Sequence, residues 1–240
     1  MALFKNCALG CGTAHTGRTP GKCSPDGTFR EAEFSRELCR RVAARVSSLG
    51  INAFIDFDAL DPDPAWHSSR WDVEQQRELN ARVAWANNLA RTYGVRRTLY
   101  LSMHVDAAGS GGKWMTAGGW TAYTTPGHTL ADVASECLYD KAEIHLKHYA
   151  AQMEAGKLTG LYDRKQTPYR IDLTDGDRDR EKRFYVLRNT ICPAVLTENL
   201  FQDNRADVAF LKSREGMEAL VALHVEGVVE YFKNLENYER

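Results

Sequence analysis

Four polar residues stand at the ends or starts of predicted secondary-structure elements, and their types suit metal-assisted hydrolysis. They are two histidines and two glutamates: His15, Glu31, His104 and Glu198. Two imidazoles and one carboxylate form a common catalytic zinc shell, which leaves a fourth coordination position for water or substrate. A second carboxylate that does not bind the metal can act as general base and then as general acid. The set is chemically complete if the fold brings it together.

His104 follows an apolar run that has the length of a buried strand, 98–104, and glycines at 109–112 end the element soon afterwards. It therefore lies at the C-terminal end of a central strand, where open α/β sheets bind their ligands. A lone histidine there is more often a core residue. Glu198 similarly ends the apolar run 193–198, where burying a carboxylate is costly unless it is paired or functional.

A structural role explains Glu31 as well as metal binding does. Thr28 and Glu31 have the spacing of a helix capping box, in which the glutamate side chain turns back toward the threonine. A carboxylate turned back in this way would point away from a metal, so the residues alone leave both roles open. His15 lies in a loop rich in Gly, Thr and Pro, residues 10–22, and has no packing reason to be there.

Predicted strands and amphipathic helices alternate along the chain. Strands are expected at 3–9, 51–57, 98–104, 120–124 and 193–198, with a further ordered apolar stretch at 184–187. Helices are expected at 28–49, 74–93, 129–149 and 217–232. This order predicts a single α/β domain over residues 1–240, with a mostly parallel twisted sheet and helices on both faces.

Length and composition agree with one compact, soluble domain. The chain has 240 residues, of which 43% are hydrophobic, enough to bury a full core. The 31 basic residues nearly balance the 32 acidic ones, so the charge gives no sign of a nucleic-acid or anionic-membrane partner. No apolar run approaches the roughly 18 residues of a membrane span. The N-terminus shows no secretory signal, so we expect that the protein reaches its target by another route or that a leader has been removed.

The cysteines are too sparse for a disulfide scaffold, so we expect reduced and mostly buried thiols. There are six: Cys7, Cys11, Cys23, Cys39, Cys137 and Cys192. Cys7, Cys11 and His15 stand four residues apart and, with Cys23, allow a structural zinc site as an alternative. Such sites normally use pairs spaced C-x2-C, and a second pair is missing here, which makes this alternative the weaker one.

Two other residues are better explained by packing than by chemistry. Cys192 and His104 would allow a cysteine hydrolase, but Cys192 precedes a strand instead of following one and is expected to be a small buried residue. His224 lies on the apolar face of the closing helix, where we expect it in the core.

The segment 150–183 lacks periodicity and carries a charged run at 175–183. Long irregular segments in compact domains are often functional loops, whereas a charged run is usually solvated. Since the segment precedes the strand that ends at Glu198, we expect it to border a substrate groove, with its arginines meeting acidic groups of the substrate.

Several stretches of the chain, taken together, resemble one known family. They are His15 with Thr19–Lys22, Glu31 ahead of Ser35 and Arg36, Arg82–Asn87, Leu101–Ala107 and Cys192–Asn204. In order and spacing they are similar to the zinc-dependent N-acetylmuramoyl-L-alanine amidases of the amidase-3 type, which hydrolyse peptidoglycan. The resemblance runs from about His15 to Tyr231, nearly the whole chain.

The resemblance implies one Zn²⁺ ion held by His15, Glu31 and His104, with Glu198 as the general base. The implied reaction is hydrolysis of the amide bond between N-acetylmuramic acid and L-alanine. The implied place of action is the cell envelope, as a phage lysin or a processed bacterial enzyme. Peptidoglycan is then the partner, nucleic acid and membrane insertion are not expected, and the protein is expected to be a monomer.

The chain departs from the family pattern at two places. The family usually has an aspartate shortly before the first histidine, whereas Gly12, Thr13 and Ala14 precede His15 here, and it tends to have asparagine where this chain has Asp106. The alternative to an enzyme is a catalytically silent peptidoglycan-binding or regulatory protein on the same fold. The presence of all four site residues favours the enzyme.

Overall fold

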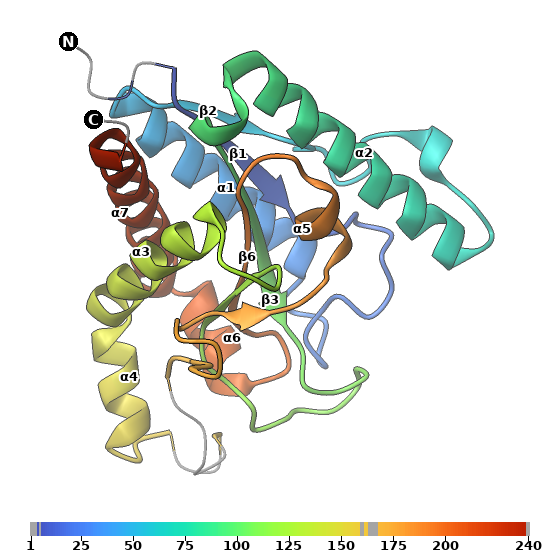
Figure 1. Cartoon of the computed structure of the whole chain (residues 1–240). Helices are drawn as coiled ribbons and strands as arrows, with labels where there is room; N and C mark the ends of the chain where they lie inside the picture. The colour runs from blue at the N-terminus through green and yellow to red at the C-terminus, as the bar shows by residue number, and fades with distance from the viewer. Residues whose placement is uncertain (1–3, 5, 159–160, 163–167, 239–240) are drawn as a thin grey trace.

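The computed structural model describes residues 4, 6–158, 161–162 and 168–238, and its centre is one sheet (Figure 1). The strands are β1 (Ala8–Thr13), β2 (Asn52–Ile55), β3 (Thr98–Asp106), β4 (Thr121–Thr124), β5 (Arg180–Glu181) and β6 (Ala194–Phe201), in the spatial order β2-β1-β3-β6-β4-β5. All neighbouring pairs are parallel except β4 with β6. The prediction of an α/β fold with a mostly parallel sheet is confirmed.

Helices cover both faces of the sheet (Figure 1). They are α1 (Glu31–Ser48), α2 (Trp71–Tyr93), α3 (Leu130–His145), α4 (Lys147–Glu154), α5 (Tyr185–Asn189), α6 (Arg205–Lys212) and α7 (Arg214–Tyr238), with 3-10 turns at Pro64–Trp66 and Val95–Arg97. Helices α1, α3 and α7 pack together over the larger apolar core, and α2 and α5 cover a smaller cluster around Tyr100 on the other face. No helix in the described part of the chain has the length and apolar character needed to cross a membrane.

Some predicted boundaries were wrong. The first strand is 8–13 instead of 3–9. Gly10 and Gly12 belong to this strand and do not end it, because the strand passes close to other side chains: a Cβ on Gly12 would lie 2.5 Å from the Tyr100 hydroxyl. Residue 3 lies outside the described residues. The predicted helix 129–149 is divided into α3 and α4 at Leu146, and the stretch 184–187 belongs to the short helix α5.

The charged run is less solvated than predicted. Asp179 is buried and accepts a hydrogen bond from the Thr124 hydroxyl at 2.9 Å, and Arg178 forms ion pairs with Glu136, Asp140 and Glu143 on α3. The segment is therefore attached to the fold through its charges. The cysteine prediction is confirmed: all six are free, and all but Cys23 are buried.

His224 is a core residue, as predicted. Its side chain is fully buried, Nδ1 donates to the Leu220 carbonyl at 2.7 Å, and Nε2 accepts from the Thr197 hydroxyl at 3.0 Å. Burial lowers the pKa of His224 to about 4. The ring is therefore neutral in the folded protein, and both of its nitrogens have partners.

We expect His224 to make the protein less stable as the pH falls below about 6.5. The unfolded chain takes up a proton near pH 6.5, whereas the folded protein does so only near pH 4, so acidification favours the unfolded state. Between pH 7 and 5 this residue should remove about 2 kcal/mol of unfolding free energy. Urea unfolding at several pH values should show a flatter pH dependence for His224→Gln than for the wild type. The exposed-site control His148→Gln should keep the wild-type slope, and equal slopes in all three proteins would contradict the expectation.

Candidate active site

The two central strands place His104 and Glu198 side by side. In the parallel pair β3–β6, His104 lies opposite Glu198 in the register. Because side chains alternate along a strand, both residues share the face of Tyr100 and Leu196, which is the face that α2 and α5 cover. Both also lie near the C-terminal ends of their strands, where ligands of open α/β sheets bind.

The capping box that would have occupied Glu31 is not formed. Helix α1 begins at Glu31, its N-cap Arg30 makes no side-chain cap bond, and the Thr28 hydroxyl instead donates to Asp26 at 3.0 Å. The Glu31 carboxylate points across to β3, where its Oε1 accepts a hydrogen bond from the Val105 amide at 3.1 Å. Of the two roles that the sequence left open, the orientation favours the metal ligand.

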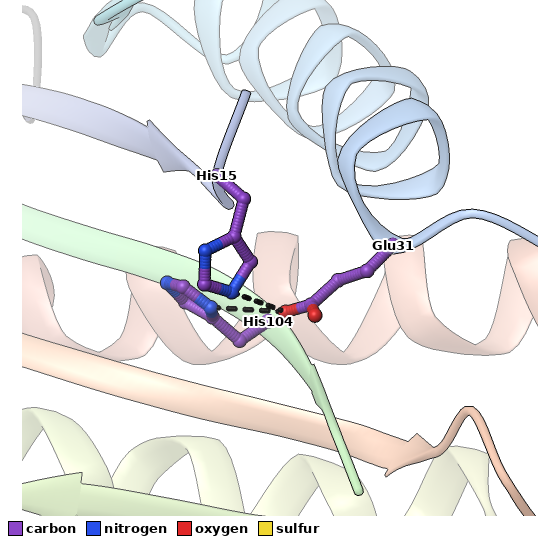
Figure 2. A group of neighbouring side chains, drawn as sticks. All are labelled: His15, Glu31 and His104. Atoms are coloured by element: carbon purple, nitrogen blue, oxygen red, sulfur yellow. Dashed lines mark hydrogen bonds and ion pairs between the residues drawn. The ribbon is translucent and has the colours of Figure 1, made fainter. Parts of the chain in front are cut away.

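His15, Glu31 and His104 converge from three elements (Figure 2). Nε2 of His15 lies 3.4 Å from Oε1 of Glu31, and Nδ1 of His104 lies 3.0 Å from the same oxygen. The two imidazole rings meet edge to face, with their centroids 5.1 Å apart. One ligand atom from each residue lies within 4.8 Å of the others, close enough for the three residues to share one metal ion.

The charge states of this triad also suit a metal ion. Burial alone would raise the pKa of Glu31, but the facing His15 and the hydrogen bond with His104 hold that pKa well below its ordinary value, so the carboxylate is ionised. Burial lowers the pKa of His104, which favours the neutral ring. Oε2 of Glu31 and Nε2 of His15 are buried and make no hydrogen bond. The Lys22 ammonium lies 3.8 Å from Oε2, beyond hydrogen-bond distance, so a metal ion would still supply a close partner and the residues fit the group.

A second group of potential ligands, His128, Asp132 and Asp177, meets the same spacing at the start of α3. Its histidine is exposed. None of these three residues lines the cavity beside His15 and His104.

Glu198 completes the cleft. Together with His15 and His104 it lines a cavity of about 260 Å³, whose other wall is formed by α2 and by Phe184–Val186. Its Oε2 is buried and makes no hydrogen bond. Burial raises the pKa of the Glu198 carboxyl well above its ordinary value, and the nearby Asp106 and Glu31 carboxylates raise it further. All four predicted site residues are thus in one place.

Sequence reasoning missed how the His15 loop is held. His15 has a left-handed backbone, with φ of +52°, and its carbonyl accepts hydrogen bonds from Arg36 Nη2 at 2.9 Å and Arg82 Nη2 at 3.1 Å. Both arginines are buried, and both belong to stretches that carry the family resemblance. Because their partners lie 21 and 67 residues away, no local pattern shows the contacts.

A buried aspartate supports these contacts from the end of β2. Asp56 accepts from the Thr13 amide at 2.9 Å and from Arg82 Nη1 at 2.5 Å, and Glu78 pairs with the same arginine at 3.0 Å. The aspartate that the family places before the first histidine is absent here, and Asp56 supplies a carboxylate to the His15 loop from another strand.

The strand end at His104 is fixed by uncharged partners. Asn199 Nδ2 donates to the His104 carbonyl at 3.0 Å, and the Ser102 hydroxyl lies 3.1 Å from His104 Nε2. The Ser35 hydroxyl joins three elements, since it donates to the Met103 carbonyl at 2.6 Å and accepts from the Ala14 amide at 2.8 Å. These contacts leave Nδ1 of His104 facing Glu31 and His15.

The geometry does not support the alternatives that use cysteine. Cys192 is buried before β6, and burial raises the pKa of its thiol to about 12, so it carries no nucleophilic thiolate at neutral pH. Cys7 and Cys11 are buried as well. Neither of the two metal-ligand groups within the described part of the chain contains a cysteine.

Comparisons with known proteins found a matching family model and several similar proteins. A family model described as N-acetylmuramoyl-L-alanine amidase matches residues 12–230. The endolysin of Bacillus phage SPP1 is 30% identical over 165 residues, which are 68% of this chain and 51% of the endolysin. The N-acetylmuramoyl-L-alanine amidase CwlM of Bacillus licheniformis is 41% identical over 63 residues, 25% of each protein. The matches thus span about half of one relative and a quarter of the other.

The fold has solved counterparts. The crystal structure of an N-acetylmuramoyl-L-alanine amidase from Clostridium difficile 630 superimposes with a TM-score of 0.66 at 17% identity, covering 94% of this chain and 96% of that one. At this level of identity the likeness shows a shared fold.

We expect Asp56→Asn to destabilise the protein strongly. Asp56 and Arg82 are both buried, and removing the carboxylate leaves a buried guanidinium with only part of its charge compensated. Breaking such a pair costs roughly 3–5 kcal/mol. Denaturant unfolding measures the loss, and Asp72→Asn, which breaks an exposed pair with Arg70, should leave stability unchanged. Equal stability of both variants would contradict the structural role given to Asp56.

Proposed function

This chain belongs to the N-acetylmuramoyl-L-alanine amidase family, and on that premise we propose that it is a zinc-dependent peptidoglycan hydrolase. The bond that it cleaves is the amide between the lactyl group of N-acetylmuramic acid and L-alanine. We further propose that it acts in the cell envelope, either as a phage lysin or as an exported enzyme. A monomer suffices for this reaction, because one chain supplies all four site residues.

The observation that carries the proposal is the meeting of His15, Glu31 and His104 beside Glu198 in one cleft. A buried carboxylate and two histidines so close together are costly for a protein that only binds its ligand. A hydrolase needs this combination, because a metal centre and a separate proton carrier act on the same bond.

His15, Glu31 and His104 would hold the zinc ion. When bound, such an ion supplies Lewis-acid polarisation of a carbonyl and acidification of water. The ionised Glu31 carboxylate would contribute the negative charge of the ligand set, and the two imidazole rings would contribute nitrogen donors. The Val105 amide and the backbone contacts of His15 and His104 keep the donors in place before substrate arrives.

Glu198 would carry the proton. Its buried Oε2 makes no hydrogen bond, so it can accept a proton from water and then donate it to the leaving nitrogen of L-alanine. Its raised pKa makes the carboxylate a stronger base toward water, and the proton that it takes up is then available to the leaving nitrogen. The products are a free lactyl carboxylate and a free stem peptide.

We expect digestion of purified peptidoglycan to release stem peptides that begin with alanine, and only in the presence of metal. Mass spectrometry of the soluble products identifies the cleaved bond, because cleavage elsewhere gives different masses. Treatment with a chelator should abolish release, and added Zn²⁺ should restore it. Release of disaccharides, or peptide release that survives chelation, would contradict the proposal.

Replacement of Glu198 should separate chemistry from metal binding. Glu198→Gln is expected to retain zinc and to lower kcat by at least about 100-fold, because general acid–base catalysis is lost. Glu31→Gln should lose the ion, whereas Glu33→Gln, at an exposed position of the same helix, should keep both ion and activity. The number of zinc ions bound per protein molecule is best measured in an Asp177→Asn background, because this substitution removes one residue of the second ligand group.

The catalytically silent alternative predicts a different outcome of the same measurements. A binding protein would sediment with peptidoglycan without releasing peptides, and Glu198→Gln would change nothing. Full activity of Glu198→Gln would likewise rule out its role as the proton carrier.

A further inference from the structure

Asp106 adds a third carboxylate to the neighbourhood of Glu31 and Glu198. It lies two residues after His104 at the end of β3, and its side chain is 24% exposed. The Asp106 carboxylate acts electrostatically on Glu198, as Glu31 does. Partly buried like charges repel each other, so this arrangement needs a compensating cation. The family tends to have an uncharged asparagine here.

Arg170 provides that cation. Its Nη1 lies 2.6 Å from Asp106 Oδ2, and its side chain is 22% exposed, so the ion pair is largely shielded from solvent. The same guanidinium lies 4.9 Å from the centre of the Phe201 ring. Phe201 is opposite Asp106 in the β3–β6 register, just beyond the irregularity that follows His104. Arg170 therefore contacts the ends of both strands that carry the site.

The backbone of Arg170 is fixed to the next strand of the sheet. Its amide donates to the Trp120 carbonyl at 2.8 Å, and its own carbonyl accepts from the hydroxyls of Thr121 at 2.8 Å and Tyr139 at 3.0 Å. Thr121 in turn lies opposite Glu198 in the β4–β6 pair. The arginine thus starts from a rigid position on one side of Glu198 and reaches over to Asp106 on the other.

We propose that Arg170 is a positioning residue for the hydrolysis proposed above: its ion pair with Asp106 and its contact with Phe201 hold the ends of β3 and β6 so that Glu198 stays aligned with His104. The inference rests on the proposed function. Without the arginine, the Asp106 carboxylate has no cation partner and turns toward solvent, which disturbs the strand end. With asparagine at position 106, the charge that needs compensation is absent, and the arginine contributes only its contact with Phe201.

A double-mutant cycle tests this role. On a soluble muramyl peptide, Arg170→Gln should lower kcat by about tenfold or more with little change in KM, in the range that coupled neighbouring residues show. Asp106→Asn should have a small effect, and the double variant Asp106→Asn/Arg170→Gln should recover most of the lost kcat. Arg178→Gln is the matched control, because this arginine of the same segment pairs with α3 and should leave kcat unchanged.

The possible outcomes are distinct. Wild-type kcat in Arg170→Gln, or no recovery in the double variant, would overturn the inference while leaving the amidase proposal intact. A raised KM that Asp106→Asn does not rescue would show that Arg170 binds the substrate instead, which is the role first expected for arginines of this segment. Wild-type protein without amidase activity would overturn both proposals. Thermal unfolding of each variant identifies any loss of kcat that comes from misfolding.

Discussion

The burial of the Glu31 carboxylate is the constraint on which the site depends. Its side chain is only 1% exposed, and an ionised group so far from water needs several partners. The Val105 amide and the two imidazoles supply them, and the first turn of α1 adds the positive end of the helix dipole. These partners belong to three segments, so the start of α1, the His15 loop and the end of β3 must meet.

A second set of buried charges keeps the His15 loop in its left-handed conformation. Arg36 and Arg82 both donate to the His15 carbonyl, and Asp56 and Glu78 balance Arg82. Burial would lower the pKa of Arg82, yet the two carboxylates raise it above its ordinary value, so the guanidinium stays charged. The metal-facing histidine is thus positioned through its backbone, by charges that belong to α1, α2 and β2.

The two departures from the family pattern have the same physical character. A carboxylate is missing before His15 and an extra one appears at Asp106, and in both places residues distant in the sequence restore the balance. Asp56 serves the His15 loop, and Arg170 compensates Asp106. Arg170 takes part in the site through this ion pair.

The sequence by itself determined the fold class and the placement of His104 and Glu198, because apolar runs, alternation along strands and glycine-rich ends are local signals. Only the tertiary structure decided whether Glu31 caps its helix or faces the cleft, since both roles fit the same spacing. The contacts of Arg36, Arg82, Asp56 and Arg170 were also beyond prediction, because their partners lie 21 to 67 residues away in the chain. Hydrogen bonds between such distant segments leave no periodic trace, and folding alone brings them together.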